Sequence, residues 1–299
     1  MPEEDSFIKN LIFRLIKKHI SGATINSAFK LAKSLSEEGT HTSITFLNEN
    51  PNDVIKARYN LNAYINLAKQ ISRLNMDSSI SLRLSQIGIK LNSELFRKNM
   101  DEIIKISDSL GIVLWLEYEK DVNYNNIFDT YIAYADNFRH IGIELPIRNI
   151  KIDNYLTRLK NKALIKLTYH SYIKESEVKS KKHLNIVDSY SIAIDQINSK
   201  LNELYIIEPE EKVINRLVEK NKVYKRNLIF EMPLGYSKKW KKKFEKKKVG
   251  LSVYLPYGKD WIPYAIDKLT EGRIRNLAIT FLDGKKIREK NGKLSKTKK

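Results

Sequence analysis

The sequence of 299 residues contains no cysteine, which excludes disulfide bonds, thiol catalysis and cysteine metal sites. Histidine is also scarce, and none of the five histidines stands at the spacing typical of metal ligands. We therefore predict that the chain has no metal site. Its length is enough for one large domain or two small ones with a substantial apolar core.

Long apolar runs are missing as well, and no segment could span a bilayer. Residues 6–20 are the most apolar part of the amino terminus, but Lys9 and Arg14 interrupt them and no small-residue cleavage site follows, which excludes a signal peptide. Their apolar side chains recur at helical spacing: Phe7, Ile8, Leu11, Ile12, Leu15 and Ile16. This pattern predicts an amphipathic helix. We expect a cytoplasmic protein in which this helix packs on the domain, with a peripheral position on a membrane surface as the alternative.

Acidic residues are few compared with basic ones, at 35 Asp plus Glu against 54 Lys plus Arg. Such an excess is compatible with nucleic acid or anionic membranes as partners, and equally with a surface that is simply basic. Residues 238–248 are the densest internal cluster, with Trp240 and Phe244 four positions apart. We favour a surface helix anchored by these rings over a phosphate-binding patch. The basic tail, residues 284–299, is predicted to be disordered.

Short apolar runs alternate with segments of helical period along the chain. The runs cover residues 41–47, 79–85, 112–118, 141–145, 163–169, 183–189, 227–232 and 250–255. Strands regularly separated by helices indicate βαβ units and a parallel sheet. Eight units in this length fit a closed (β/α)₈ TIM-type barrel, an α/β fold, better than an open sheet. We expect amino-terminal helices (1–40) packed on a barrel that spans 41–283.

Polar residues near the predicted strand ends are the first candidates for a functional site, because a barrel carries its chemistry at the carboxyl ends of its strands. Charges inside a barrel strand need partners. Arg83, Glu117, Lys166 and Glu231 are therefore predicted to form an ion-pair network at the barrel mouth. The network is either a ligand site or a structural network in which the charges neutralise one another. The residue types alone leave both possibilities open.

Several segments, read together, carry a further signal. They are SISLRLSQIGIKL (79–91), LWLEYEKD (114–121), ALIKLTYHSY (163–172), FEMPLGY (230–236) and SVYLPYGKDWIPYAIDKLTE (252–271). In order and spacing they resemble the proline dehydrogenase family, FAD-dependent (β/α)₈ barrels that oxidise proline to pyrroline-5-carboxylate. The last segment is similar to that family's eighth strand and to the final helix that caps the barrel mouth. The resemblance spans nearly the whole chain.

The resemblance implies a substrate site. The family's lysine and aspartate beneath the substrate correspond to Arg83 and Glu117, which become the catalytic candidates. The remaining substrate-binding candidates lie in the last segment: Tyr254, Tyr264, Asp267 and Lys268. The two tyrosines keep the family pattern and would wall the substrate. Asp267 and Lys268 stand where the family has two arginines that clamp the proline carboxylate.

The resemblance also implies FAD as cofactor, with contacts at Glu144, Lys166, Tyr172, Asp188, Glu231 and Glu271. Lys166 corresponds to a strand-five arginine near the flavin, and Glu144 and Glu231 correspond to glutamines that face it. Asp188 corresponds to a residue at the end of the sixth strand. A diphosphate prefers positive groups or backbone donors. The carboxylates of Glu144, Asp188 and Glu231 have the wrong sign of charge for it.

Two functions remain open from the sequence. In the first, the chain oxidises L-proline or a related cyclic secondary amine, transfers the hydride to FAD and passes the electrons to a membrane quinone. In the second, the barrel has kept its fold without its chemistry and serves as a binding or scaffold protein, with nucleic acid as one partner of its basic surface.

Overall fold

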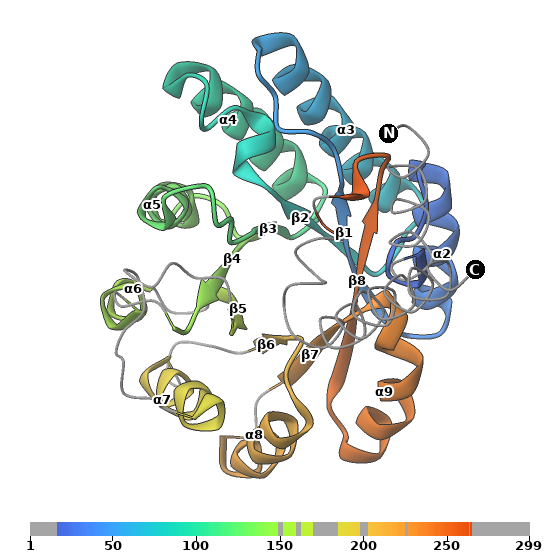
Figure 1. Ribbon diagram of the computed structural model, residues 1–299, viewed down its shortest axis with the longest axis vertical. Helices are drawn as coiled ribbons and strands as arrows, with labels where there is room; N and C mark the ends of the chain where they lie inside the picture. Colours follow the sequence, from blue (N-terminus) through green and yellow to red (C-terminus); the bar gives the residue numbers. More distant parts are fainter. Residues whose placement is uncertain are drawn as a thin grey trace, which may run out of the picture.

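Eight parallel strands form a closed barrel in the computed structural model, which describes residues 17–148, 152–159, 163–169, 185–197, 203–224, 227–262 and 264. Each strand pairs with the next one along the chain, and β8 returns to pair with β1. Figure 1 shows the helices arranged around the outside of this ring. The predicted (β/α)₈ fold class is confirmed. Of the predicted capping helix at the carboxyl end, only residues 261, 262 and 264 are described.

The strands are β1 (His41–Phe46), β2 (Ser78–Leu82), β3 (Leu114–Leu116), β4 (Ile141–Pro146), β5 (Leu164–Thr168), β6 (Glu203–Ile207), β7 (Asn227–Pro233) and β8 (Gly250–Tyr257). The α-helices are α2 (Ile25–Glu37), α3 (Val54–Arg73), α4 (Ser93–Ser109), α5 (Tyr124–Ala135), α6 (Ile152–Arg158), α7 (Ile186–Ile197), α8 (Glu211–Tyr224) and α9 (Leu234–Lys247). Two short 3₁₀ turns, η1 (Lys17–His19) and η2 (Leu84–Ile87), accompany them. Helix α2 packs on β1 and β8.

The prediction of the sixth strand was wrong. In the described part of residues 183–189 the chain has already entered α7, and β6 is Glu203–Ile207. The apolar residues of the run belong to a stripe with helical period, whose buried members are Tyr190, Ala193, Ile194 and Ile197. The side chain of Asn185 accepts hydrogen bonds from the backbone of Val187 and Asp188, which starts the helix. Asp188 is therefore an exposed residue in the first turn of a helix and does not end a strand.

The strands are buried on both faces, as expected of a parallel sheet covered by helices. One face packs outward against the helices with residues such as Ile44, Leu114 and Ile143, all fully buried. The other face fills the barrel, where Trp115, Tyr205 and Ile229 form a separate apolar cluster. Large rings thus occupy the interior near the beginnings of the strands, and the barrel is a packed core.

Helix α9 holds its two rings against the barrel. Trp240 is 3% exposed and Phe244 is 1% exposed. Phe244 stacks on Phe230 of β7 with ring centroids 5.0 Å apart, and Trp240 stacks on Phe244 at 5.4 Å. The predicted helix anchored by these rings is confirmed. Neither ring is free to stack on a nucleic-acid base, so only the lysines of this helix could contact phosphate.

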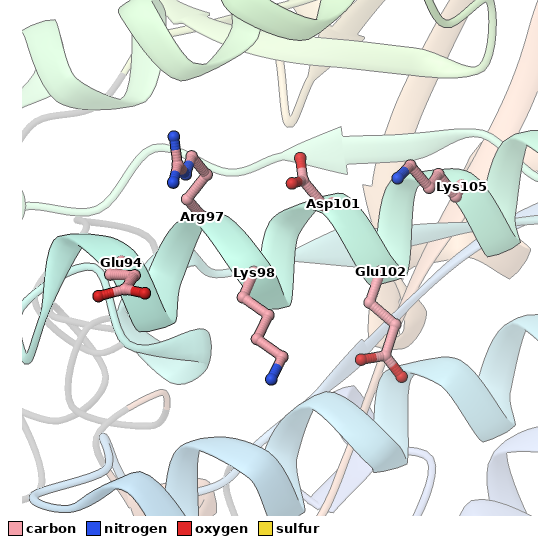
Figure 2. A pocket seen from close by; sticks show the side chains of 6 residues that line it. All are labelled: Glu94, Arg97, Lys98, Asp101, Glu102 and Lys105. Atoms are coloured by element: carbon pink, nitrogen blue, oxygen red, sulfur yellow. The ribbon is translucent and has the colours of Figure 1, made fainter.

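Helix α4 bears a shallow groove lined by alternating charges: Glu94, Arg97, Lys98, Asp101, Glu102 and Lys105. Figure 2 shows Lys98 and Glu102 on one flank of the helix, and Arg97 and Asp101 on the other. Both flanks are tied to neighbouring helices. Arg58 of α3 donates to Glu102 through both of its Nη atoms, and the Tyr134 hydroxyl of α5 donates to Asp101 at 2.6 Å. We assign this groove to helix packing.

The fold generates a prediction at Gly142, whose strand position lies beside Trp115. A Cβ atom at Gly142 would stand 2.4 Å from the Trp115 ring. We expect Gly142→Ala to lower the free energy of unfolding by about 1–3 kcal/mol, because the rigid ring must move within a packed interior. Urea denaturation measures the loss. Gly250→Ala is the matched comparison and should cost less, since its Cβ would meet the flexible Ile229 side chain at 2.9 Å. Equal stability of both variants and the parent would contradict this account.

Candidate active site at the barrel mouth

Three residues from three strands meet on one carboxylate at the barrel mouth. Arg83 directly follows β2, Glu117 directly follows β3, and Tyr254 lies in β8. Arg83 Nε donates to Glu117 Oε2 at 3.0 Å, and the Tyr254 hydroxyl donates to Glu117 Oε1 at 2.7 Å. The two catalytic candidates therefore form one hydrogen-bonded unit with a substrate-binding candidate. Their roles remain a prediction.

The electrostatics of this unit keep its charges fixed. Burial alone would lower the pKa of Arg83, but the adjacent Glu117 carboxylate and its other neighbours raise it well above the ordinary value. Burial, followed by the Glu117 carboxylate, raises the pKa of Tyr254 well above its ordinary value. Arg83 therefore stays cationic, and Tyr254 stays a protonated donor to Glu117.

Tyr264 lies beside Tyr254, with ring centroids 6.3 Å apart. Its ring is buried in a small cluster with Ile20 and Leu47, at the end of β1 and near the beginning of the described chain. The structure thus brings Tyr254 and Tyr264 together, as the sequence predicted. The other predicted members of this part of the site, Asp267, Lys268 and Glu271, lie outside the described residues, as does Tyr172.

Deeper in the barrel, Lys166 of β5 and Glu231 of β7 form a second ion pair. Lys166 Nζ lies 2.7 Å from Glu231 Oε2, and both side chains are 2% exposed. Two strand serines complete the pair: Lys166 donates to Ser43 Oγ at 3.0 Å, and Ser252 Oγ donates to Glu231 Oε2 at 3.1 Å. Lys166 Nζ also stands over the Trp115 ring at 4.6 Å. The four predicted network residues therefore form two separate pairs among the described residues.

Two further carboxylates lie close to the mouth. Glu144 of β4 accepts a hydrogen bond from the backbone of Tyr118 at 3.2 Å. Glu119 was not among the predicted site residues, and it accepts from both the backbone (3.0 Å) and the hydroxyl of Ser85. Burial raises the pKa of Glu119 above its ordinary value, although Ser85 and the Arg83 charge oppose that shift.

Sequence reasoning also missed Ser43 and Ser252, which hold the buried ion pair. The available signal was their position, since each is a small polar residue on the inward face of a strand. Serine is so common in sequences that this signal stands out only once the partner charges are placed.

Among the described residues no group of histidine, aspartate or glutamate could hold a metal ion. In that same part of the chain, no helix is both long and apolar enough to cross a membrane.

The buried pair yields a test of stability. Lys166→Met leaves the Glu231 carboxylate without its counter-charge, so we expect a loss of about 3–5 kcal/mol in the free energy of unfolding. Lys166→Met combined with Glu231→Leu should recover most of that loss, because apolar replacement of a whole buried pair is often neutral. Urea denaturation of the single and double variants gives the coupling between the two residues. Additive losses would show that they do not act as a pair.

The raised pKa of Glu119 predicts a dependence of stability on pH. A carboxyl whose folded pKa is raised contributes its stability at low pH and loses it as the pH rises through the folded pKa. At about pH 8, above the titration range of an ordinary glutamate, Glu119→Gln should therefore raise the midpoint of thermal unfolding. The gain should shrink as the pH falls through that range. A gain that is constant with pH would contradict the prediction.

Known proteins resemble this chain along most of its length. Proline dehydrogenase 2 of Bacillus subtilis (strain 168) is 22% identical over 270 residues, which cover 88% of each chain. Proline dehydrogenase of Deinococcus radiodurans is 20% identical over 281 residues, which cover 90% of each chain. No family model matches.

Solved structures share the fold. Proline utilization A (PutA) from Bdellovibrio bacteriovorus, inactivated by N-propargylglycine, superposes with a TM-score of 0.71 at 13% identity. PutA from Corynebacterium freiburgense gives 0.63 at 14% identity. The present chain spans about a third of each PutA chain. The chain is thus similar to proline dehydrogenases over most of its length, and it shares the eight-stranded barrel of the PutA structures.

Proposed function

We propose that the barrel mouth binds L-proline or a related cyclic secondary amine, in keeping with a proline dehydrogenase-like function. The observation that carries this proposal is the Glu117 carboxylate, which Arg83 and Tyr254 hold from either side at the mouth. A secondary amine is cationic at neutral pH, and a fixed carboxylate is its natural partner. Similarity to proline dehydrogenases over 88% of the chain supports the choice of ligand class.

The residues at the mouth have separable tasks in this proposal. The rings of Tyr254 and Tyr264 offer an apolar wall for a five-membered ring, and burial of that ring against them excludes water. Glu117 orients the amine, and Tyr254 fixes the Glu117 carboxylate through its hydroxyl. Because the partners of Glu117 are already in place, little reorganisation is needed when the ligand binds.

In the family's reaction the amine is oxidised to pyrroline-5-carboxylate, and FAD, when bound, supplies the redox chemistry as hydride acceptor. The electrons then pass to a quinone. The described residues do not fit that cofactor. Lys166, the cation that corresponds to the family's arginine near the flavin, is neutralised by Glu231, whereas a diphosphate or a flavin needs positive groups or donors. We therefore derive no step through the flavin.

The same observation favours a second candidate, a barrel that retains its amine site and has lost the oxidation. In this candidate the chain is a binding or scaffold protein whose ligand is the same small amine. Nucleic acid has weaker support as a partner, since the rings of the lysine-rich helix α9 are buried.

One pair of measurements separates the candidates. We expect L-proline to raise the midpoint of thermal unfolding of the purified chain, because a ligand that binds only the folded state stabilises it. We expect the protein to leave a desalting column without a flavin spectrum after incubation with FAD, since the Lys166 charge is already neutralised.

A flavin spectrum that survives desalting and is bleached by proline would instead establish the oxidation and reject the second candidate. If L-proline leaves the midpoint of thermal unfolding unchanged, both candidates are rejected. L-Leucine, an open-chain amino acid, is the control ligand and should give a smaller shift, because it lacks the cyclic secondary amine.

A further inference from the structure

Helix α3 exposes an apolar patch at its amino-terminal end. Val54 is 57% exposed, Ile55 is 81% exposed and Tyr59 is 63% exposed. We call these three residues the α3 patch. Of the large apolar side chains that are exposed in the described part of the chain, only Ile192 lies elsewhere. Single exposed apolar residues are normal on a protein surface, whereas a group of them indicates an interaction site.

The patch is confined to one end of the helix. Farther along the exposed face of α3 the side chains are polar, as at Asn66 and Lys69. One flank of α3 packs closely against α4, where Arg58 is paired with Glu102. Helix α2, the neighbour on the other side, makes few contacts with α3. The surface is therefore suited to one short apolar segment that lies over the beginning of α3.

A buried hydroxyl beside the patch has no partner. Tyr257 ends β8 and is 3% exposed, and its hydroxyl makes no hydrogen bond within the described part of the chain. Burial raises the pKa of Tyr257, and the hydroxyl of Tyr59 raises it further, which requires the two phenols to lie close together. Buried polar groups are normally hydrogen-bonded. The unpaired hydroxyl therefore indicates that a further polar group belongs next to the patch.

The charges around the patch favour a basic occupant. Glu49 and Asp53 are exposed just before it, and Asp260 accepts a hydrogen bond from the backbone of Glu49 at 3.2 Å. The nearby bases are Lys56 and Lys259. The carboxylates outnumber the lysines, so an anionic lipid surface gains little attraction here, whereas a basic apolar segment is attracted.

The chain itself contains such a segment. Residues 1–16 lie outside the described residues, and within them residues 7–16 combine apolar side chains at helical spacing with Lys9 and Arg14 and contain no acidic residue. The described chain begins near α3, because Ile20 packs with Leu47, which directly follows β1. A helix over residues 7–16 would be about 15 Å long, enough to cover the patch, which occupies fewer than two turns of α3.

We propose that residues 7–16 dock on the α3 patch as an amphipathic helix, with their basic side chains toward Glu49 and Asp53. This interface is separate from the ligand site and does not depend on the proposed function. It nevertheless reaches the barrel mouth, since Ile20 and Tyr264 belong to one buried cluster. The docked segment would thereby support one of the two tyrosines that line the mouth.

The absence of cysteine from the chain allows a direct test by disulfide cross-linking. Ile55→Cys is combined in the full chain with Leu11→Cys, and with Ile8→Cys or Leu15→Cys to cover other registers. The matched control is Ile55→Cys with Asn10→Cys, because Asn10 lies on the opposite face of the predicted helix. A disulfide forms only where the Cα atoms come within about 7 Å. We expect at least one apolar position to cross-link about tenfold faster than Asn10→Cys, since docking raises its effective concentration. Equal rates at all positions would overturn the proposal.

Proteolysis gives a second readout that needs no cysteine. Trypsin cleaves after Arg14, and a docked segment is protected in proportion to the time it spends docked. Ile55→Asp places a charge in the patch and should release the peptide that ends at Arg14 about tenfold faster, as measured by mass spectrometry. Asn66→Asp, on the polar part of the same face, is the control and should leave the rate unchanged. Thermal unfolding confirms that both variants are folded. Release from Ile55→Asp at the parental rate would contradict docking at this patch.

Two results would assign the patch to a different occupant. Ile55→Cys alone may be oxidised beside Asn66→Cys alone, and faster formation of a disulfide-linked dimer by the former would indicate a second copy of the chain. Flotation of the wild-type protein with vesicles of anionic phospholipid, lost in Ile55→Asp, would indicate a lipid surface. Either result overturns the assignment to residues 7–16.

Discussion

A lysine inside a closed barrel needs a carboxylate, and this requirement organises the interior. The Lys166–Glu231 pair draws on four strands, because Ser43 of β1 and Ser252 of β8 complete its hydrogen bonds. A buried charge without a partner would cost about 3–5 kcal/mol, a large share of the stability of a folded domain. Beneath the pair, large rings fill the beginnings of the strands. The interior is therefore layered, with apolar rings first, then a neutral ion pair, and then the ionic mouth.

The neutral middle layer determines what the mouth can attract. Because Lys166 and Glu231 cancel, they add little to the potential above them. The local charges are then Arg83 against Glu117 and Glu119, with Glu144 nearby. Burial raises the pKa of Glu119, so this environment disfavours the ionised carboxyl. The mouth therefore attracts a polyanion such as a dinucleotide diphosphate only weakly. A zwitterion can contact a cation and an anion that lie side by side.

The sequence was sufficient for most of the fold, because strands covered on both faces produce apolar runs that stand out between helices. It failed at the sixth strand for a definite reason. Ile186 and Val187 look like a strand but belong to the helical stripe of α7, while Leu204 and Tyr205 of the true strand follow Ile197 at spacings that continue a helix. For the site, the sequence identified the charged residues and predicted one network, whereas the structure has two separate pairs. Partner choice depends on which side chains point inward after the barrel closes, and residues 34 to 65 positions apart are joined only then.

The Arg83–Glu117 pair at the barrel mouth forms without a residue from the segment after β8. An aspartate next to a lysine, as at positions 267 and 268, is a poor clamp for an anion, since the two charges compete within one site. Arg83 belongs to the rigid junction after β2, and its orientation depends on Glu117 and not on the segment after β8. In the proposed function, the amine contact at Glu117 therefore depends on Arg83 and Tyr254 and not on positions 267 and 268.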